Sequence, residues 1–145
     1  MPDSFDKLAC DDVVIEGFVD SLDEVFQRCK VFVAPLVSGA GIKGKVLDAM
    51  SYGVPSVLSP VAAEGTPLTH GSTAWIAESP DDWVSHIATL YEDQTQWQAC
   101  SERLAELVAG NFSFDAGAQR MQKPLSYLGI FPPRRQQAQP ARSAA

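Results

Sequence analysis

Residues 31–36, with the sequence VFVAPL, constrain the fold more than any other stretch of this chain. Every side chain in the run is apolar, which is typical of a strand buried on both faces of a parallel sheet. A glycine-rich stretch follows at 39–44, and good helix formers then occupy residues 45–52. Gly53 and Pro55 are placed to end that helix. This order predicts a unit of strand, glycine loop and helix.

The same alternation recurs along the rest of the chain. Further strands are expected at 11–17, 56–58 and 74–77, and further helices at 21–29, 79–91, 95–109 and from 113 onward. Ser21 and Glu24 match a capping box, Gly110 is expected to stop one helix, and Pro124 is expected to kink or end the last. Apolar strands alternating with helices predict an α/β fold with an open parallel sheet. In such sheets, ligands bind outside the carboxyl ends of the strands.

Length and charge limit the classes of function. The chain has 145 residues and a net charge of −7, and its acidic residues all lie between Asp3 and Asp115. No basic stripe is present that could bind a nucleic-acid backbone, so we expect no nucleic-acid partner. No apolar run approaches the roughly 20 residues of a membrane-spanning helix, and the first residues lack a signal-peptide core. We therefore expect a cytoplasmic protein without a transmembrane segment.

The titratable side chains most often found at metal sites are few and scattered. Cys10, Cys29 and Cys100 form no C-x-x-C pair, and the latter two fall at apolar helix positions that predict buried thiols. His70 and His86 have no ligand at metal-binding spacing. We expect no metal and no other cofactor, and we expect the two histidines to be structural.

The glycine loop admits a first interpretation as a dinucleotide site. Gly39, Gly41 and Gly44 satisfy G-x-G-x-x-G, and Glu64 lies near the spacing of about 20 residues expected for an acid that binds ribose. However, two residues separate the strand from the first glycine, and another strand and helix are expected to precede it. Glu64 also follows Pro60 in a loop. An NAD-linked oxidoreductase half is therefore the weaker interpretation.

A longer stretch supports a second interpretation. Residues 31–65, VFVAPLVSGAGIKGKVLDAMSYGVPSVLSPVAAEG, resemble the signature of retaining nucleotide-sugar glycosyltransferases of the two-domain GT-B fold, the family-4-like group that includes sucrose synthases. The matching pieces occur in order as PL, GAGIK, VLDAM, GVP and EG. The segment EGFVDSLDEVFQRC at 16–29 is also similar to the part that precedes them. The resemblance covers about residues 13–128 and implies a Rossmann-like, C-terminal donor-binding domain.

The resemblance also implies a role for individual residues. Backbone amides at the start of a helix can bind phosphate, and glycines let the ligand approach the main chain closely. The donor diphosphate and sugar would be bound by Gly39, Ala40, Gly41, Ile42 and Lys43. Asp48 holds the position of the carboxylate that binds the ribose, and Glu64 resembles an acid near the donor site. Many relatives have a second acid where this chain has Ala40. Catalytic residues are not identified.

The domain organisation follows from the same resemblance. We expect a donor-binding domain at 1–130, shortened at its N-terminus, and a disordered tail at 131–145 rich in Pro, Arg, Gln and Ala. Relatives bind the acceptor on a separate N-terminal domain and place a basic pair ahead of the segment at 11–17. We therefore expect a fragment of a glycosyltransferase that is poorly active or inactive without that partner domain. The alternatives are a non-catalytic nucleotide-binding or regulatory module, favoured by Ala40, and the NAD-linked half.

Overall fold

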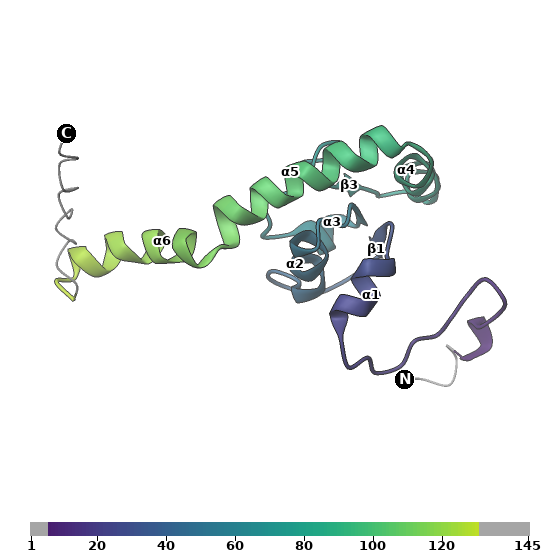
Figure 1. Cartoon of the computed structure of the whole chain (residues 1–145), viewed down its shortest axis with the longest axis horizontal. Coiled ribbons are helices and arrows are strands. Elements are labelled where there is room, and N and C mark those ends of the chain that lie inside the picture. The colour runs from purple at the N-terminus through teal and green to yellow at the C-terminus, as the bar shows by residue number, and fades with distance from the viewer. Residues whose placement is uncertain (1–5, 131–145) are drawn as a thin grey trace, which may run out of the picture. The chain divides into compact units, whose positions relative to one another are not determined.

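A computed structural model describes residues 6–130 and contains a three-stranded parallel sheet flanked by helices (Figure 1). The strands are β1 (Phe32–Ala34), β2 (Ser56–Leu58) and β3 (Trp75–Ile76), and they lie in the order β1-β2-β3. In register, Val33 is opposite Val57, and Val57 is opposite Trp75. Consecutive parallel strands are joined by helical connections, as a parallel sheet requires. The predicted α/β fold, a Rossmann-like sheet with helices on its faces, is confirmed.

The helices follow the predicted alternation. They are η1 (Asp6–Leu8, a short 3-10 helix), α1 (Leu22–Arg28), α2 (Gly44–Ser51), α3 (Pro60–Ala63), α4 (Pro80–Glu92), α5 (Gln94–Phe112) and α6 (Phe114–Tyr127). Contacts divide the chain into two compact units, Met1–Ala105 and Glu106–Ala145. The domain predicted at 1–130 stays a prediction, and the tail predicted at 131–145 lies outside the described residues.

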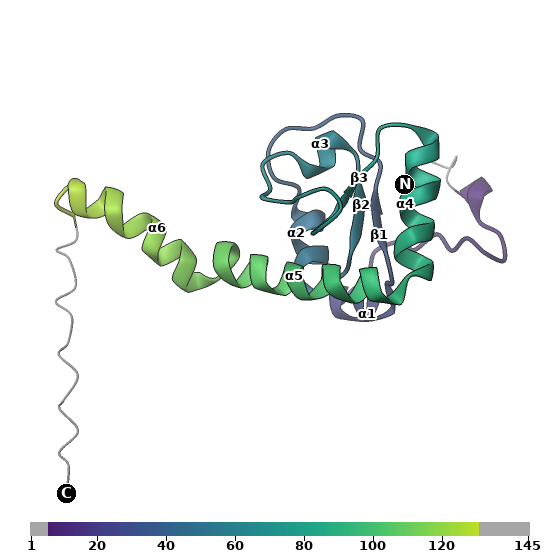
Figure 2. The same ribbon diagram turned by 90° about the horizontal axis from the view of Figure 1, so that it is seen from above.

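The core of the first unit is built around β2. All three residues of β2 are buried, and α2 and α4 lie on opposite sides of the sheet (Figure 2). Met50 from α2 and Leu90 from α4 are buried. Val57 and Leu58 are apolar, as a strand covered on both faces requires, and the buried Ser56 hydroxyl donates to the Val54 carbonyl. The prediction that residues 31–36 form a strand buried on both faces is wrong, because Val33 of β1 is 38% exposed at the edge of the sheet.

A second group of apolar contacts joins α1 to α2 and β1. Phe26, Ala49 and Val54 form a buried cluster against which Phe32 packs. The ring of Phe26 also stacks on Tyr52 at 5.0 Å between centroids. α1 is therefore held by its apolar face, as its helical spacing predicted.

The strand predicted at 11–17 is wrong. Cys10 and Val13 form an isolated antiparallel bridge, and the following residues through 19 have no regular structure. Val14 is 76% exposed and Phe18 is 93% exposed. A strand needs a partner for its backbone groups, and within the described residues β1 forms the edge of the sheet with no neighbour beyond it. Apolar sequence alone does not create a strand.

Two details of the predicted helix ends are also wrong. Ser21 has the extended backbone of an N-cap, but its side chain makes no capping hydrogen bond. α5 continues through Gly110 to Phe112, since a helical glycine costs only about 1 kcal/mol relative to alanine. α6 ends at Tyr127, three residues after Pro124, and the kink expected at this proline stays a prediction.

Ser79, in contrast, caps α4 as expected. Its hydroxyl accepts a hydrogen bond from the Asp82 amide, and the Asp82 carboxylate accepts from the Ser79 amide. Within residues 6–130, no helix combines the length and the apolar character needed to cross a membrane.

Candidate functional site

The glycine loop leaves the carboxyl end of β1 and enters α2. Gly39 and Gly41 have φ values of 135° and 71°, a region that side chains other than glycine rarely adopt. Lys43 is the N-cap residue of α2. The sequence therefore bends the main chain sharply above the sheet and directs it into a helix start. This is the edge at which open α/β sheets bind ligands.

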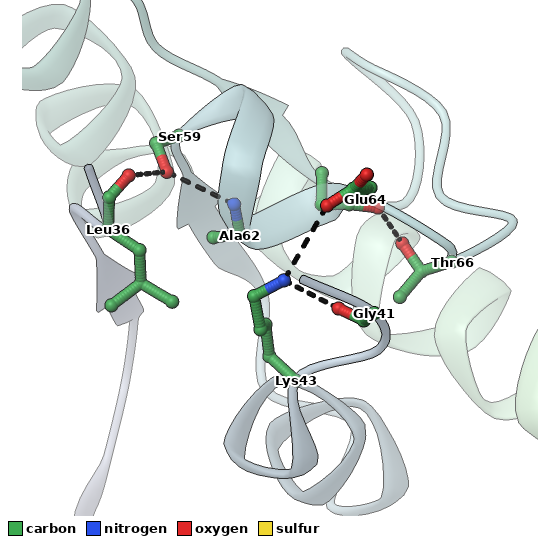
Figure 3. Close-up of polar contacts among 8 residues, drawn as sticks. Leu36, Gly41, Lys43, Ser59, Ala62, Glu64 and Thr66 are labelled. Carbon is green, nitrogen blue, oxygen red and sulfur yellow. Dashed lines mark hydrogen bonds and ion pairs between the residues drawn. The ribbon is translucent and has the colours of Figure 1, made fainter. Parts of the chain in front are cut away.

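Lys43 is the central side chain of this loop. Its ammonium donates a hydrogen bond to the carbonyl of Gly41 at 2.5 Å and lies 3.8 Å from the Glu64 carboxylate (Figure 3). The Lys43 side chain is only 14% exposed, whereas Glu64 is 59% exposed. A Cβ atom at Gly39 would lie 3.2 Å from Cε of Lys43, so glycine leaves room for the lysine to fold back. The loop thus holds one positive charge against its own backbone.

Gly65 lets the turn after α3 pack beside Lys43. It has a φ of 76°, and a Cβ atom at this position would lie 3.1 Å from Cγ1 of Ile42. The absence of a side chain lets the Glu64–Gly65 turn pack closely against the glycine loop. Two loops that follow different strands therefore meet at Ile42 and Lys43. The sequence singled out Glu64 but did not predict its pairing with Lys43.

Ser59 links the connection after β1 to the connection after β2 at a point nearer the sheet. Its hydroxyl donates to the Leu36 carbonyl at 2.7 Å and accepts from the Ala62 amide at 3.1 Å (Figure 3). Ser59 thereby caps α3, a helix that we did not predict. The signal was present, because Ser59-Pro60 repeats the Ser-Pro start that correctly predicted α4.

The backbone of the glycine loop presents free donors. Among the residues that the structure describes, none accepts a hydrogen bond from the amides of Gly41, Ile42 or Lys43. A Cβ atom at Gly41 would meet no atom within 4 Å, so the space beside this residue is open. Free amides at a helix start, next to a lysine, can bind an anion.

A pocket of about 380 Å³ lies at the carboxyl ends of all three strands. Leu36 and Val37 come from the connection after β1, and Ser59 and Pro60 from the connection after β2. Trp83 of α4 forms another part of the lining. The pocket and the Lys43–Glu64 pair share the same two connections.

Asp48 lies further along α2 and is not part of the Lys43–Glu64 cluster. It is half-buried, and no described residue hydrogen-bonds to its carboxylate; its main-chain carbonyl accepts from Ser51 and Tyr52. The Tyr52 hydroxyl donates to Asp23, and this hydrogen bond, followed by burial and by the charges of Asp23 and Asp48, raises the pKa of Tyr52. The Asp48 carboxylate therefore has no hydrogen-bond partner among the described residues and can accept hydrogen bonds from a ligand. Ala40 is exposed and offers a methyl group only.

The remaining candidate groups have structural environments. His70 accepts a hydrogen bond at Nδ1 from the Ile76 amide at 2.9 Å, and its ring lies 5.3 Å from that of His86. Cys100 is buried, which raises the pKa of its thiol to about 11, and Cys29 is half-buried. Among residues 6–130, no group of three or more His, Cys, Asp or Glu side chains is arranged to hold a metal ion.

Comparisons with known proteins agree with this architecture. Residues 2–93 match the family model described as glycosyl transferases group 1. A Klebsiella pneumoniae protein described as an uncharacterized 44.6 kDa protein in the cps region is 32% identical over 68 residues. That similarity covers 47% of this chain and 18% of the relative, so the chain matches a minor part of that longer protein. No solved structure matches. The family match covers more than half of the sequence, and the chain belongs to the group 1 glycosyltransferases.

Proposed function

We propose that this chain is the donor-binding part of a glycosyltransferase and that it binds the diphosphate of a nucleotide sugar at residues 39–43. The observation that carries the proposal is the set of three free amides beside the Lys43 ammonium at the start of α2. A diphosphate is a compact double anion that such a loop fits. Residues 35–43 connect β1 to this helix at the ligand-binding edge of the sheet.

The diphosphate would replace Glu64 as the charged partner of Lys43. The ammonium and the Glu64 carboxylate are 3.8 Å apart, so their contact is loose compared with a direct hydrogen bond. A phosphate oxygen placed at the free amides would compete for the ammonium, and more than half of the Glu64 side chain already reaches solvent. The Gly41 carbonyl is thus the closer partner of the ammonium, and Glu64 is the one that a phosphate would replace.

The rest of the donor would be bound on either side of the loop. Asp48 is the candidate for the ribose hydroxyls, because its carboxylate is free to accept hydrogen bonds and the family resemblance assigns it this role. The pocket lined by Leu36 and Trp83 provides space beside the loop for the glycosyl group. The base and the sugar are not specified by these contacts.

The reaction of the whole enzyme would be glycosyl transfer to an acceptor, with retention of the anomeric configuration as the resemblance implies. Lys43 and the loop amides would stabilise the negative charge that develops on the leaving diphosphate. No metal ion is needed in this scheme. The acceptor would be bound by a separate N-terminal domain, and activity would require it.

A second candidate is a nucleotide-binding module that does not turn over substrate. Ala40 favours it, because a methyl group cannot hold the donor hexose as a carboxylate would. An NAD-linked role has less support, since the family match explains the glycines without a dinucleotide.

Calorimetric titration of the chain with UDP, GDP, ADP and NAD tests the proposal. We expect one of the nucleoside diphosphates to bind. The variant Lys43→Gln should weaken that binding by about tenfold or more, because it removes a charge-assisted hydrogen bond. Lys45→Gln is the matched control, since Lys45 is exposed in the same helix turn, and it should change the affinity by less than about threefold.

The outcomes separate the three interpretations. Binding of NAD alone would reject the donor site. Equal losses of nucleotide affinity in both lysine variants would show that the loop attracts anions through its overall positive charge and not through a specific contact with Lys43. Nucleotide binding without transfer, after an N-terminal acceptor domain is supplied, would support the module.

A further inference from the structure

The pocket at the carboxyl ends of the strands has a one-sided charge. Each strand contributes the residues that follow it, with Leu36 after β1, Ser59 after β2 and Glu78 after β3, and Trp83 is added from α4. The other described residues of the lining are prolines and small aliphatic residues. Glu78 is thus the one charged side chain among the described residues that line this pocket, and the lining includes no basic residue.

The carboxylate of Glu78 is the main polar side-chain group that the pocket offers to a ligand. The Ser59 hydroxyl is already occupied, because it donates to the Leu36 carbonyl and accepts from the Ala62 amide. The Glu78 amide donates to the Asp82 carboxylate at 3.1 Å, but the exposed carboxylate of Glu78 itself pairs with no described residue. An ionised carboxylate only accepts hydrogen bonds, so a ligand in this pocket must donate them.

Trp83 gives the same pocket an aromatic wall. Its side chain is half-buried in the first turns of α4. An indole ring provides a broad apolar surface on which the C–H groups of a sugar ring can pack. The volume of about 380 Å³ is within the range of small-molecule sites, roughly 300–1,000 Å³. A ligand here would therefore meet an apolar wall and a single strong acceptor.

We propose that Glu78 selects a donor whose glycosyl group carries hydroxyls and no negative charge. The inference rests on the proposed function, which places the diphosphate at residues 39–43 and the glycosyl group in this pocket. Glu78 would accept hydrogen bonds from the sugar hydroxyls while Trp83 contacts the ring. A sugar carboxylate, as in a uronic acid, would lie near a like charge with no basic side chain in the described lining to offset it. Glu78 is in this account a specificity-determining residue.

Titration of the ¹⁵N-labelled chain with glucose 1-phosphate and glucuronate 1-phosphate, followed by NMR, tests the proposal without a choice of base. Glucose 1-phosphate should shift the amides of residues 41–43 and the indole N–H of Trp83. It should bind about tenfold more tightly than glucuronate 1-phosphate, although the uronate brings more negative charge to Lys43. Trp97 is the internal reference, because its indole donates to the Lys30 carbonyl at 2.6 Å outside this pocket and should not shift.

Two variants remove the same charge at different places. Glu78→Gln should lower the preference for glucose 1-phosphate over glucuronate 1-phosphate to about threefold or less, because the repulsion is gone. Glu92→Gln is the matched control, since Glu92 is exposed at the other end of α4, and the preference should stay near tenfold.

A titration with inorganic pyrophosphate separates this inference from the proposed function. If pyrophosphate leaves the amides of residues 41–43 unshifted, the diphosphate site is wrong and the inference falls with it. If pyrophosphate shifts these amides, three results would overturn the inference alone. These are equal affinities for the two sugar phosphates, an unmoved Trp83 indole with glucose 1-phosphate, and equal effects of the two variants on the preference.

Discussion

Two segments of this chain have similar sequences and different structures. Residues 11–28 and residues 31–51 both contain an apolar run, a glycine and an amphipathic helix. The second forms β1 and α2, whereas in the first only the helix α1 forms and the apolar run is exposed. The difference lies in partners, because β1 pairs with β2 while the residues before α1 pair with no strand of the described chain. A strand is specified by its neighbours as much as by its own residues.

Thiol reactivity should show the largest contrast between the exposed segment before α1 and the packed core. Cys10 is exposed before α1, and Cys100 is buried in the core with a pKa raised to about 11 by burial. At pH 8 the thiolate fraction of a group with this pKa is on the order of one in a thousand, roughly two hundredfold less than for an ordinary thiol. Alkylation followed by mass spectrometry should modify Cys10 first and Cys100 last. Equal rates would mean that the core opens freely.

Substitution of valine should next separate the exposed run before α1 from the buried strand β2. Val57 in β2 is fully buried, whereas Val14 is exposed. Val57→Ala should lower the free energy of unfolding by about 2–3 kcal/mol, because it removes buried methyl groups and leaves a cavity. Val14→Ala should change it by less than about 0.5 kcal/mol. Urea denaturation measures both. A large effect at Val14 would mean that residues 11–17 are packed in solution.

The two serine N-caps offer a smaller contrast. Ser79 accepts a hydrogen bond from the Asp82 amide, whereas Ser21 makes no capping bond. Ser79→Ala should therefore destabilise the protein by about 1 kcal/mol, and Ser21→Ala should have almost no effect. Thermal unfolding of the two variants would compare them directly. Equal shifts in Tm would show that the Ser21 cap forms in solution.

The smallest effect is expected in the dependence of protein stability on acid pH. Hydrogen bonds from the amides of Ser79 and Glu78 hold the pKa of Asp82 below its usual range. A carboxylate with a lowered pKa stabilises the fold above its unfolded pKa of about 3.9, and this contribution is lost as the pH falls through the folded value. Asp82→Asn should therefore flatten the loss of stability below about pH 4. If the stability of the Asp82→Asn variant falls as steeply below about pH 4 as that of the unchanged protein, the capping box is contradicted.

The elements that sequence predicted correctly are those whose signals are local. The Ser79-Pro80 start, the helix after Gly44 and the positions of β1 and β2 are each specified by a few adjacent residues. Burial of β1 on both faces was wrong, since Val33 is 38% exposed at the edge of the sheet. The strand at 11–17 is wrong because it has no long-range partner among the described residues. Local signals also misled at the Ser21 capping box and at Gly110, through which α5 continues.

The candidate site shows the same division. The loop glycines and Asp48 were found from sequence, but the meeting of Lys43 with Glu64 depends on Gly65 packing against Ile42. That contact joins the loop after β1 to the loop after β2, and no pattern of neighbouring residues predicts it. The Ser59 cap could have been found, because it repeats the Ser79 pattern.

The central claim is that the amides of residues 41–43 bind the donor diphosphate. Titration of the ¹⁵N-labelled chain with UDP, GDP and ADP, followed by NMR, tests it most directly. We predict that the largest amide shifts occur at Gly41, Ile42 and Lys43 and saturate with the nucleotide that binds. Saturating shifts confined to other residues, with these three amides unmoved, would contradict it.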